Sequence, residues 1–413
     1  MLVLGAGAAG LAATMALERA SAGIPGLEVC LVDRRNYHLF QPLLYQVVTG
    51  GVEPGHICFA VRSMLRGGGN TPPVVFRESR VDEIDIARKQ VTTDSGALDW
   101  DYLVIALGST TNFLDVPGAE ENALPLKSLR DGISVHNRIL DQYEAALREP
   151  EGPRRRELLT FAVVGGGATG VELAASIGDF VNKVMVRDYP EMTPLVRVVL
   201  VEGKDRLLTG MKSQAARLAL RRLRTRGIEV LLETRVSRVW HDGIRGEDGQ
   251  ALPTGLVIWV TGIKPVPVAA ALPFDRERDG RFVVSPTLEV PETPGVYVVG
   301  DCCHLRQPTG EEAYPPTGQI AVRQGLACAR NIINAATGRQ PVPFDYRYKG
   351  ELISMGRNVA IAQIGELAFD GFPAWLLWRV YYLGKLMGFR SKLSVALDWS
   401  LAYFYHRNTA RLE

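Results

Sequence analysis

Two glycine-rich loops, far apart in the sequence, constrain the fold of this chain more than any other feature. Each follows a short apolar run and precedes a stretch rich in alanine and leucine, as in a strand, a tight turn and a helix. In the pattern G-x-G-x-x-G, the first glycine forms the turn, the second lets the backbone approach a pyrophosphate, and the third lets the helix pack closely on the strand. The pattern glycines are Gly5, Gly7 and Gly10 in the first loop and Gly165, Gly167 and Gly170 in the second. Two such loops predict two nucleotide cofactors, and two cofactors in one chain suggest electron transfer between them.

Each loop is followed by a second apolar run that ends in an acid. The run at residues 28–32 ends in Asp33, and the run at residues 196–201 ends in Glu202. A carboxylate at this place accepts hydrogen bonds from the ribose hydroxyls of an adenosine, roughly 20 residues beyond the loop. A single acid at a strand end is commonly a solvent-facing residue. The repetition after both loops favours nucleotide binding instead.

The bulk composition describes a globular protein with enough apolar residues for a large core. The chain has 413 residues, of which 46% are hydrophobic and 22% charged. Its net charge of +2 gives no indication of a nucleic-acid-binding surface. The cysteines are Cys30, Cys58, Cys302, Cys303 and Cys328. Their spacing makes neither a disulfide framework nor a metal site, so we expect a reducing environment and small, buried cysteines at 302 and 303. The chain begins within an expected strand, so we expect no signal peptide, and no apolar run reaches 18 residues.

The order of the patterns predicts an α/β fold with two Rossmann-like dinucleotide-binding domains, the second inserted in the first. A charged break rich in proline and glycine at residues 149–157 precedes the second loop. After that domain, an apolar run at residues 295–301 and a helical pattern at residues 318–336 repeat the strand-and-helix pattern of the first domain, so we expect them to belong to it. The predicted division is a first domain at 1–115 and 265–345, an inserted domain at 116–264, and a C-terminal region at 346–413.

Three further motifs resemble those of flavoproteins with two dinucleotide-binding domains. Residues 106–109, which include Gly108, look like the first crossover signature, and residues 260–262, which end in Gly262, look like its counterpart in the second domain. The pair Gly300-Asp301 looks like the late motif in which the aspartate meets the ribityl hydroxyls. The resemblance implies that the first domain binds FAD and that the inserted domain binds a nicotinamide nucleotide.

Within that group, the chain most resembles the type II NADH dehydrogenases, which are NADH:quinone oxidoreductases that do not pump protons. The resemblance covers nearly the whole chain and rests on residues 36–46 (NYHLFQPLLYQ), 170–174 (GVELA) and 315–321 (PPTGQIA). It implies FAD and NADH as cofactors and a membrane quinone as electron acceptor. One position departs from the family pattern A-Q-x-A-x-Q, because Arg323 stands where the second glutamine is expected.

The resemblance also implies the residues that act. Glu172 lies near the nicotinamide and the flavin in the family, although an acid in the first part of a helix can simply complement the helix dipole. Gln319 could touch both the flavin and the quinone, or could merely cap its helix. Arg323 could polarise a quinone carbonyl or could point to solvent or to a carboxylate. The expected catalytic residues are thus Glu172 and Gln319, and the expected quinone contacts are Gln319, Arg323, Gln41 and Lys385.

The segment at residues 372–407 mixes aromatic and basic residues at short intervals, which is typical of amphipathic helices that bind the surface of a lipid bilayer. The aromatic residues are Trp375, Trp378, Tyr381, Tyr382, Trp399, Tyr403 and Tyr405, and the basic residues in and just after the segment are Arg379, Lys385, Arg390, Lys392, Arg407 and Arg411. We expect peripheral attachment to the cytoplasmic face of a membrane, with the cations toward the head groups. The alternatives are packing on the protein's own core or across the interface of a homodimer.

Five other functions share parts of the pattern. A sulfide:quinone oxidoreductase needs paired redox cysteines near the flavin, and a disulfide reductase needs a C-x-x-C motif that this chain lacks, while the same fold also serves ferredoxin reductases. A naphthoquinone reductase of the demethylphylloquinone type is a close relative. An NADH-binding flavoprotein sensor, similar to apoptosis-inducing factors, would share both loops without quinone turnover.

Overall fold

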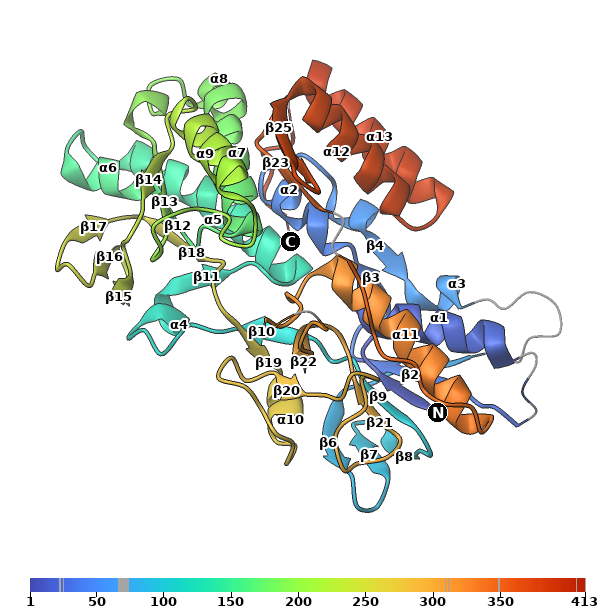
Figure 1. Ribbon diagram of the computed structural model, residues 1–413. Coiled ribbons are helices and arrows are strands. Elements are labelled where there is room, and N and C mark those ends of the chain that lie inside the picture. Colours follow the sequence, from blue (N-terminus) through green and yellow to red (C-terminus); the bar gives the residue numbers. More distant parts are fainter. Residues whose placement is uncertain are drawn as a thin grey trace. The chain divides into compact units, whose positions relative to one another are not determined.

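The computed structural model describes residues 1–21, 24, 26–65, 74–308, 310, 312–347, 350–405 and 407–412. The chain divides into two compact units, each made of segments that are distant in the sequence (Figure 1). Unit 1 comprises residues 1–39, 58–110 and 263–348, and unit 2 comprises residues 40–57, 111–262 and 349–413. The segment 111–262 of unit 2 interrupts unit 1, which confirms the prediction of one dinucleotide-binding domain inserted in another.

Unit 1 contains a parallel five-stranded sheet with the strand order β21-β9-β1-β2-β5. Its strands are β1 (Leu2–Leu4), β2 (Cys30–Asp33), β5 (Val75–Glu78), β9 (Leu103–Ile105) and β21 (Val296–Val298). Strands β1, β9 and β21 are fully buried apolar runs, as expected for a parallel sheet that is covered on both faces. The long helices are α1 (Ala8–Ser21) and α11 (Gly318–Ala336). They pack closely because Gly325 has no side chain, and a Cβ there would overlap the carbonyl oxygen of Ala9.

The rest of unit 1 consists of short elements around this sheet. The antiparallel strands are β3 (Tyr37–Leu39) paired with β4 (Cys58–Ala60), and β6 (Val81–Asp85), β7 (Gln90–Thr93) and β8 (Gly96–Asp99). Strands β20 (Phe282–Val283) and β22 (Cys303–His304) pair in parallel, and β10 (Ser109–Thr111) and β19 (Ile263–Pro265) lie where the chain passes between the units. The short helices are α3 (Val61–Met64), α10 (Pro267–Ala270) and η5 (Gly300–Cys302).

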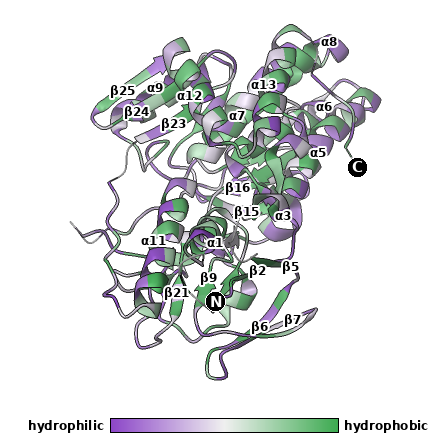
Figure 2. Cartoon of the chain, turned by 90° about the vertical axis from the view of Figure 1, so that its right-hand side faces the viewer, coloured by the Kyte–Doolittle hydropathy of each residue, from purple (hydrophilic) through white to green (hydrophobic). Residues whose placement is uncertain are grey.

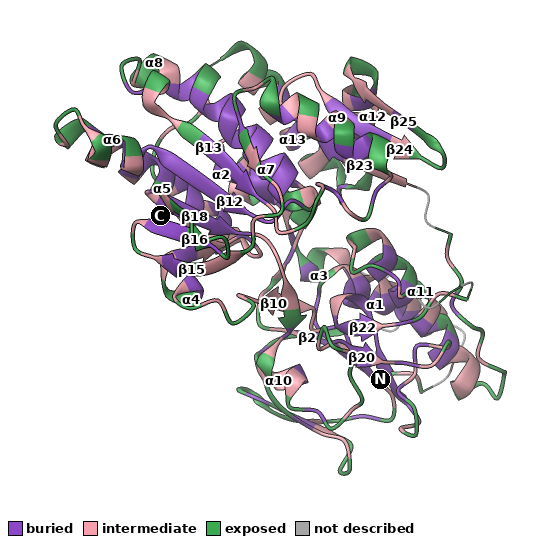
Figure 3. Ribbon diagram, turned by 60° about the vertical axis from the view of Figure 1, so that its left-hand side comes forward, coloured by how far each residue is buried: buried purple, intermediate pink, exposed green. Residues whose placement is uncertain are grey.

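Unit 2 repeats the same architecture with a parallel sheet in the order β11-β18-β12-β13-β14. Its strands are β11 (Ala123–Pro125), β12 (Thr160–Val164), β13 (Arg197–Val201), β14 (Glu229–Leu231) and β18 (Leu256–Trp259). The three central strands β12, β13 and β18 are largely buried (Figure 3). An antiparallel sheet of β15 (Val236–Trp240), β16 (Gly243–Gly246) and β17 (Ala251–Pro253) completes the nucleotide-binding part.

Helices of unit 2 cover the sheet, and the longest one has a defined start. Ser128 and Asp131 form a capping box at the beginning of α5, in which each side chain accepts a hydrogen bond from the other residue's backbone N–H. The helices are α4 (Ala119–Asn122), α5 (Leu129–Arg148), α6 (Pro153–Leu158), α7 (Ala168–Phe180), the π-helical turn η3 (Val181–Met185), α8 (Val186–Asp188), η4 (Thr193–Leu195) and α9 (Ser213–Arg224). Residues 40–57 add η1 (Gln41–Leu43), α2 (Leu44–Val48) and η2 (Pro54–Ile57), and α2 packs on α5 and α7.

The C-terminal part of unit 2 is a three-stranded antiparallel sheet followed by two helices. The elements are β23 (Gly350–Ser354), β24 (Ala360–Ile364), β25 (Leu367–Gly371), α12 (Phe372–Lys385) and α13 (Phe389–Phe404). The sequence analysis predicted the helices but not the sheet, whose strands are short and follow no strict alternation. Hydrophobic and polar residues are mixed along α12 and α13 (Figure 2), and within the described part of the chain no helix is long and apolar enough to cross a bilayer.

Candidate functional site

The two glycine loops have the same geometry, each within its own unit. The first glycines, Gly5 and Gly165, adopt φ angles of +101° and +119°, which residues with a side chain rarely adopt. At the third glycines, Gly10 and Gly170, a Cβ would overlap the carbonyl oxygen of the first glycine of the same loop. At the second glycines a Cβ would meet nothing within 4 Å, so the space in front of each helix N-terminus is open. Both loops therefore fit a pyrophosphate, which would lie against the first N–H groups of α1 and α7.

The two predicted acids also occupy equivalent places. Asp33 Oδ2 accepts a hydrogen bond from the backbone N–H of Ala6 at 2.7 Å, and Glu202 Oε2 accepts one from Gly166 at 2.6 Å. Ala6 and Gly166 are both the second residue of their loops. Each carboxylate is thus held beside its loop at the end of its strand, where a ribose hydroxyl can reach it.

Three further predicted cofactor residues follow strands of the two parallel sheets. In unit 1, Gly108 has a φ of +70° after β9, and Asp301 accepts a hydrogen bond from the Ser109 hydroxyl at 2.7 Å. In unit 2, Gly262 has a φ of +74°, and a Cβ there would press on the carbonyl oxygen of Asn112 at 2.7 Å. Within each unit, the end of the crossover strand lies beside the glycine loop, since a Cβ at Gly5 would meet Ala106 and one at Gly165 would meet Thr261.

Gln319 is in the first turn of α11 in unit 1, but it does not cap the helix. The cap is Thr317, whose side chain accepts from the backbone N–H of Ile320 at 3.4 Å. Gln319 Oε1 instead accepts a hydrogen bond from the Tyr346 hydroxyl at 2.6 Å. Within the described residues the amide nitrogen of Gln319 has no hydrogen-bond partner, so it remains able to donate to a ligand.

Arg323 follows Gln319 by one helical turn and is exposed. Its guanidinium lies over the ring of Tyr346, 5.5 Å from the ring centre. Tyr346 therefore contacts both residues, and no motif in the sequence pointed to it. The glutamine next to Arg323, Gln324, is buried in unit 1, where its Oε1 accepts from the backbone N–H of Gly300 at 2.8 Å. Gln324 thus supports the Gly300-Asp301 turn.

Glu172 is on α7 of unit 2 and is buried, with 8% of its surface exposed. Its Oε1 accepts a hydrogen bond from the backbone N–H of Ser354, at the end of β23, at 2.9 Å. Burial raises the pKa of Glu172 to about 8, and the charge of Glu351 adds to the rise, while the Ser354 hydrogen bond opposes it. At neutral pH the side chain therefore holds a proton, which the sequence analysis did not anticipate.

Aromatic side chains enclose this carboxyl group. Tyr45 is buried and Tyr382 is half-buried, and burial first and then the nearby charge of Glu172 raise the pKa of both hydroxyls. Trp378 packs on Tyr382 with ring centres 4.9 Å apart. Gln46 Nε2 donates to the Tyr45 hydroxyl at 3.0 Å. The C-terminal elements thus complete the surroundings of a residue that belongs to the nucleotide-binding part.

The two remaining predicted quinone residues lie elsewhere in unit 2. Gln41 is exposed at the start of η1, and its Nε2 donates to the backbone oxygen of Lys127 at 3.0 Å. Lys385 is exposed at the end of α12, and its ammonium lies 5.4 Å from the ring centre of Tyr381. The structure does not bring either residue to Glu172, and their quinone roles stay predictions.

The cysteines show no reactive pair. Cys302 and Cys303 are buried, as predicted, and no disulfide joins any of the five cysteines, all of which lie in the described residues. Burial raises the pKa of Cys58 to about 11 and also raises the pKa of Cys30. Thiols that stay protonated are poor nucleophiles, so the described residues offer no redox dithiol.

The fold and the paired loops define a pyridine nucleotide flavoprotein with two nucleotide-binding domains. Residues 1–325 match the family model described as pyridine nucleotide-disulphide oxidoreductase, and residues 348–408 match the model described as NDH2 C-terminal domain. The solved structure of NDH2 from Plasmodium falciparum in complex with NADH superimposes with a TM-score of 0.89 at 21% identity and covers 99% of both chains. The sulfide:quinone oxidoreductase of Aquifex aeolicus superimposes with a TM-score of 0.73 at 17% identity, covering 98% of this chain and 95% of that chain. These likenesses show the fold.

Sequence relatives give the narrower assignment. The type II NADH:quinone oxidoreductase Ndh of Mycobacterium tuberculosis is 31% identical over 98% of this chain and 88% of its own length. The external NADH-ubiquinone oxidoreductase 2 of Saccharomyces cerevisiae mitochondria is 27% identical over 92% of this chain and 77% of its own length. The chain belongs to the type II NADH:quinone oxidoreductase family.

Proposed function

We propose that this chain oxidises NADH with bound FAD and reduces a membrane quinone without pumping protons, while it lies on the cytoplasmic surface of the membrane. The repeated loop geometry carries the proposal, because each unit has its own open helix N-terminus and its own acid for one dinucleotide. Bound FAD supplies a carrier that accepts two electrons as a hydride and releases them to a quinone. The family membership agrees with this use of both cofactors.

The residues divide between the two cofactors by unit. In unit 1, the loop of Gly7 would hold the FAD pyrophosphate, Asp33 the adenosine ribose, and Asp301 the ribityl chain. In unit 2, the loop of Gly167 and the carboxylate of Glu202 would hold NADH in the same way. The predicted domain boundaries, at residues 115, 264 and 345, belong to the same proposal.

Gln319 would donate a hydrogen bond from its amide nitrogen to a carbonyl oxygen of the flavin or the quinone. The Tyr346 hydroxyl occupies the amide oxygen, which fixes the direction in which the nitrogen points. Arg323 lies beside the same tyrosine and would add positive charge near a reduced quinone oxygen.

Glu172 would supply a proton to the quinone. A carboxyl group with a pKa of about 8 is largely protonated at neutral pH and can still release its proton to a stronger base. The buried aromatic shell keeps water away from this group, so the proton is available to a bound substrate. The aromatic residues closest to the carboxyl group are Tyr45, Trp378 and Tyr382.

The membrane contact would use one face of α12 and one face of α13. Large apolar residues at intervals of mostly four are exposed along both helices, which are Phe372, Leu376 and Val380 on α12 and Phe389, Leu393, Leu397, Leu401 and Phe404 on α13. We call these residues the apolar stripe. Because a stripe of this kind suits the bilayer interface, it supports peripheral attachment.

The activity is tested with purified protein reconstituted with FAD. We expect rapid NADH oxidation with naphthoquinone or benzoquinone and none with sulfide as electron donor, since the described thiols form no redox pair. Reduction of the flavin by NADH without turnover on either quinone would instead support a sensor. Sulfide oxidation would support a sulfide:quinone oxidoreductase.

Membrane attachment is tested with the double variant Leu393→Gln/Leu397→Gln. Removing two leucines from the stripe should weaken partitioning to lipid vesicles by at least about a hundredfold, because each buried leucine contributes about 1.5–3 kcal/mol. The matched control, Leu147→Gln, changes a similarly exposed leucine on α5 and should bind vesicles like the wild type. If the stripe variant binds normally, or if its change alters the oligomeric state instead, the stripe covers a protein interface such as that of a homodimer.

A further inference from the structure

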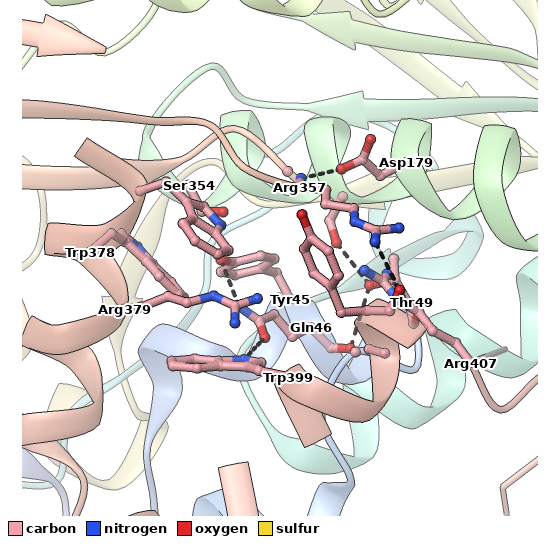
Figure 4. Close-up of a pocket in the computed structure, with 16 residues that line it drawn as sticks. Tyr45, Gln46, Thr49, Asp179, Ser354, Arg357, Trp378, Arg379, Trp399 and Arg407 are labelled. Atoms are coloured by element: carbon pink, nitrogen blue, oxygen red, sulfur yellow. Dashed lines mark hydrogen bonds between the residues drawn. The ribbon is translucent and has the colours of Figure 1, made fainter. Parts of the chain in front are cut away.

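A pocket in unit 2 brings together three arginines from three separate segments (Figure 4). Arg357 comes from the turn between β23 and β24, Arg379 from α12, and Arg407 from the segment after α13. The empty volume, including the open mouth, is about 560 Å³. The sequence analysis expected Arg379 and Arg407 to face lipid head groups from the surface of the helices, but the structure turns both toward this pocket.

The pocket has more positive than negative charge. Within the described residues, no carboxylate oxygen lies within 4.0 Å of a guanidinium nitrogen of any of the three arginines. One acid, Asp179, lines the pocket, and its Oδ1 already pairs with Lys183 Nζ at 2.6 Å. Its Oδ2 accepts a hydrogen bond from the backbone N–H of Arg357. Since Lys183 pairs with Asp179, the three arginines outnumber the acids that line the pocket, and the pocket keeps a net positive charge.

Aromatic rings and backbone oxygens hold the arginines in place. The Arg357 guanidinium lies 3.7 Å from the ring centre of Tyr403 and donates to the backbone oxygen of that residue at 2.8 Å. The Arg379 guanidinium lies between two tryptophans, 4.1 Å from the ring centre of Trp375 and 4.8 Å from that of Trp399. Such stacking orients a guanidinium while leaving its N–H donors free at the ring edge.

The donors of Arg379 have no acceptor among the described residues, and Arg407 has a single long contact, of 3.4 Å, to the backbone oxygen of Thr49. Burial lowers the pKa of Arg379 to about 10 and also lowers that of Arg407. The charge of Asp179 opposes the lowering at Arg407, while the neighbouring arginines add to the lowering at both residues. The groups remain charged at neutral pH. Three partly desolvated cations that share one acid, itself paired with Lys183, are poorly satisfied by the described residues alone.

We propose that this pocket binds a phosphate group through hydrogen bonds from the guanidinium groups of Arg357, Arg379 and Arg407. A guanidinium fork matches two oxygens of a phosphate, and a tetrahedral group offers oxygens to several forks at once, unlike a planar carboxylate. The phosphate comes either from the head group of an anionic phospholipid or from a soluble phosphate compound. The lipid source rests on the proposed membrane attachment, because α12 and α13 carry both the pocket and the apolar stripe.

The test uses the full-length, FAD-loaded protein with inorganic phosphate as the soluble probe. We expect phosphate to bind in calorimetry and to raise the melting temperature of the wild type. The variants Arg379→Gln and Arg407→Gln should each weaken binding by about ten- to hundredfold, the loss of one or two charge-assisted hydrogen bonds. The control Arg217→Gln removes an exposed charge from α9 outside the pocket and should bind phosphate normally. Retained FAD and normal reduction by NADH show that each variant has folded.

The source of the phosphate is decided with vesicles of phosphatidylcholine, alone or mixed with phosphatidylglycerol. If lipid is the source, phosphatidylglycerol increases binding of the wild type and of Arg217→Gln but not of Arg379→Gln. If phosphate binds but phosphatidylglycerol has no effect, or if vesicles fail to bind at all, the site takes a soluble phosphate and only the lipid source is wrong. If phosphate does not bind the wild type, or binds the Arg379→Gln and Arg407→Gln variants equally well, the proposal is overturned.

Discussion

Replacing Glu172 by glutamine should stabilise the protein at high pH and have a smaller effect at low pH. The glutamine has nearly the same shape, and its carbonyl oxygen can keep the hydrogen bond from Ser354. It cannot ionise, however, and ionisation of this buried group is what the surroundings disfavour. The folded-state pKa of about 8 lies above the ordinary value of 4.5. The stability that comes from the bound proton is therefore complete below pH 4.5 and is lost as the pH rises toward 8.

The magnitude follows from that difference. Each pKa unit corresponds to about 1.36 kcal/mol, so the whole rise amounts to about 5 kcal/mol, and about 3 kcal/mol of it falls between pH 6 and pH 9. For a domain of the size of unit 2, each kcal/mol in the free energy of unfolding changes the melting temperature by about 2–4 °C. Relative to the wild type, the Glu172→Gln variant should therefore gain on the order of 10 °C between pH 6 and pH 9. Relaxation of the surroundings and water entry make this an upper value.

Thermal melting of FAD-loaded wild type and variant across this pH range gives the result directly. A melting difference that stays constant with pH would refute the reasoning, since it would mean that Glu172 does not titrate there. The matched variant Glu351→Gln removes a charge that raises the pKa of Glu172. Because Glu351 repels the ionised carboxylate, its removal should shift the loss of the Glu172 proton, and with it the pH dependence of melting, to lower pH.

Three further outcomes are expected. Replacing Glu202 by Gln should narrow the preference for NADH over NADPH by about tenfold, because the charge that repels a 2′-phosphate is lost, and steady-state kinetics with both nucleotides measure it. Replacing Gln319 by Ala should slow the reoxidation of reduced flavin by quinone by about tenfold, with little effect on the reduction of flavin by NADH. Tyr346→Phe, which removes the hydrogen bond to Gln319, should slow the same step more weakly. Stopped-flow traces in which only the NADH step is slowed would contradict this. Changing Gly10 to Ala should lower both the melting temperature and the FAD content, because a Cβ at this position overlaps the backbone of Gly5. Changing Gly7 to Ala should lower the FAD content but leave the protein stably folded, because a Cβ at Gly7 meets no protein atom within 4 Å.

The nucleotide-binding parts could be predicted from the sequence because their signals are local. Each glycine loop, the strand before it and the helix after it lie within a short stretch, and the positive φ of Gly5 and the tight packing at Gly10 are properties of that stretch. The bounds of α11 also follow from apolar spacing, which predicted a helix at residues 318–336. The same local rules apply in both units, which is why the second domain could be predicted as well as the first.

The surroundings of Glu172 could not be predicted in the same way. The acid and its partner Ser354 are 182 residues apart, and the sheet that carries Ser354 has no strong pattern of its own. The burial of Trp378 and Trp399 was hidden as well, because aromatic residues in an amphipathic helix fit the membrane interface and the protein core equally well. The inward direction of Arg379 depends on Trp375 and Trp399, whose rings stack on its guanidinium.

These long-range contacts also decide how the C-terminal helices should be perturbed. Trp399 on α13 donates its indole N–H to Gln46 at 2.7 Å, and Gln46 in turn donates to Tyr45 beside Glu172. Truncation before Phe372 would therefore remove this support and expose Glu172 as well as remove the apolar stripe. We expect the truncated protein to bind FAD, whose predicted site is in unit 1, but to lose both vesicle binding and the raised pKa of Glu172. Quinone turnover would then fail for two reasons at once. Substitutions on the outward face, such as Leu397→Gln, leave the hydrogen bonds of Trp399 in place and so separate membrane attachment from chemistry.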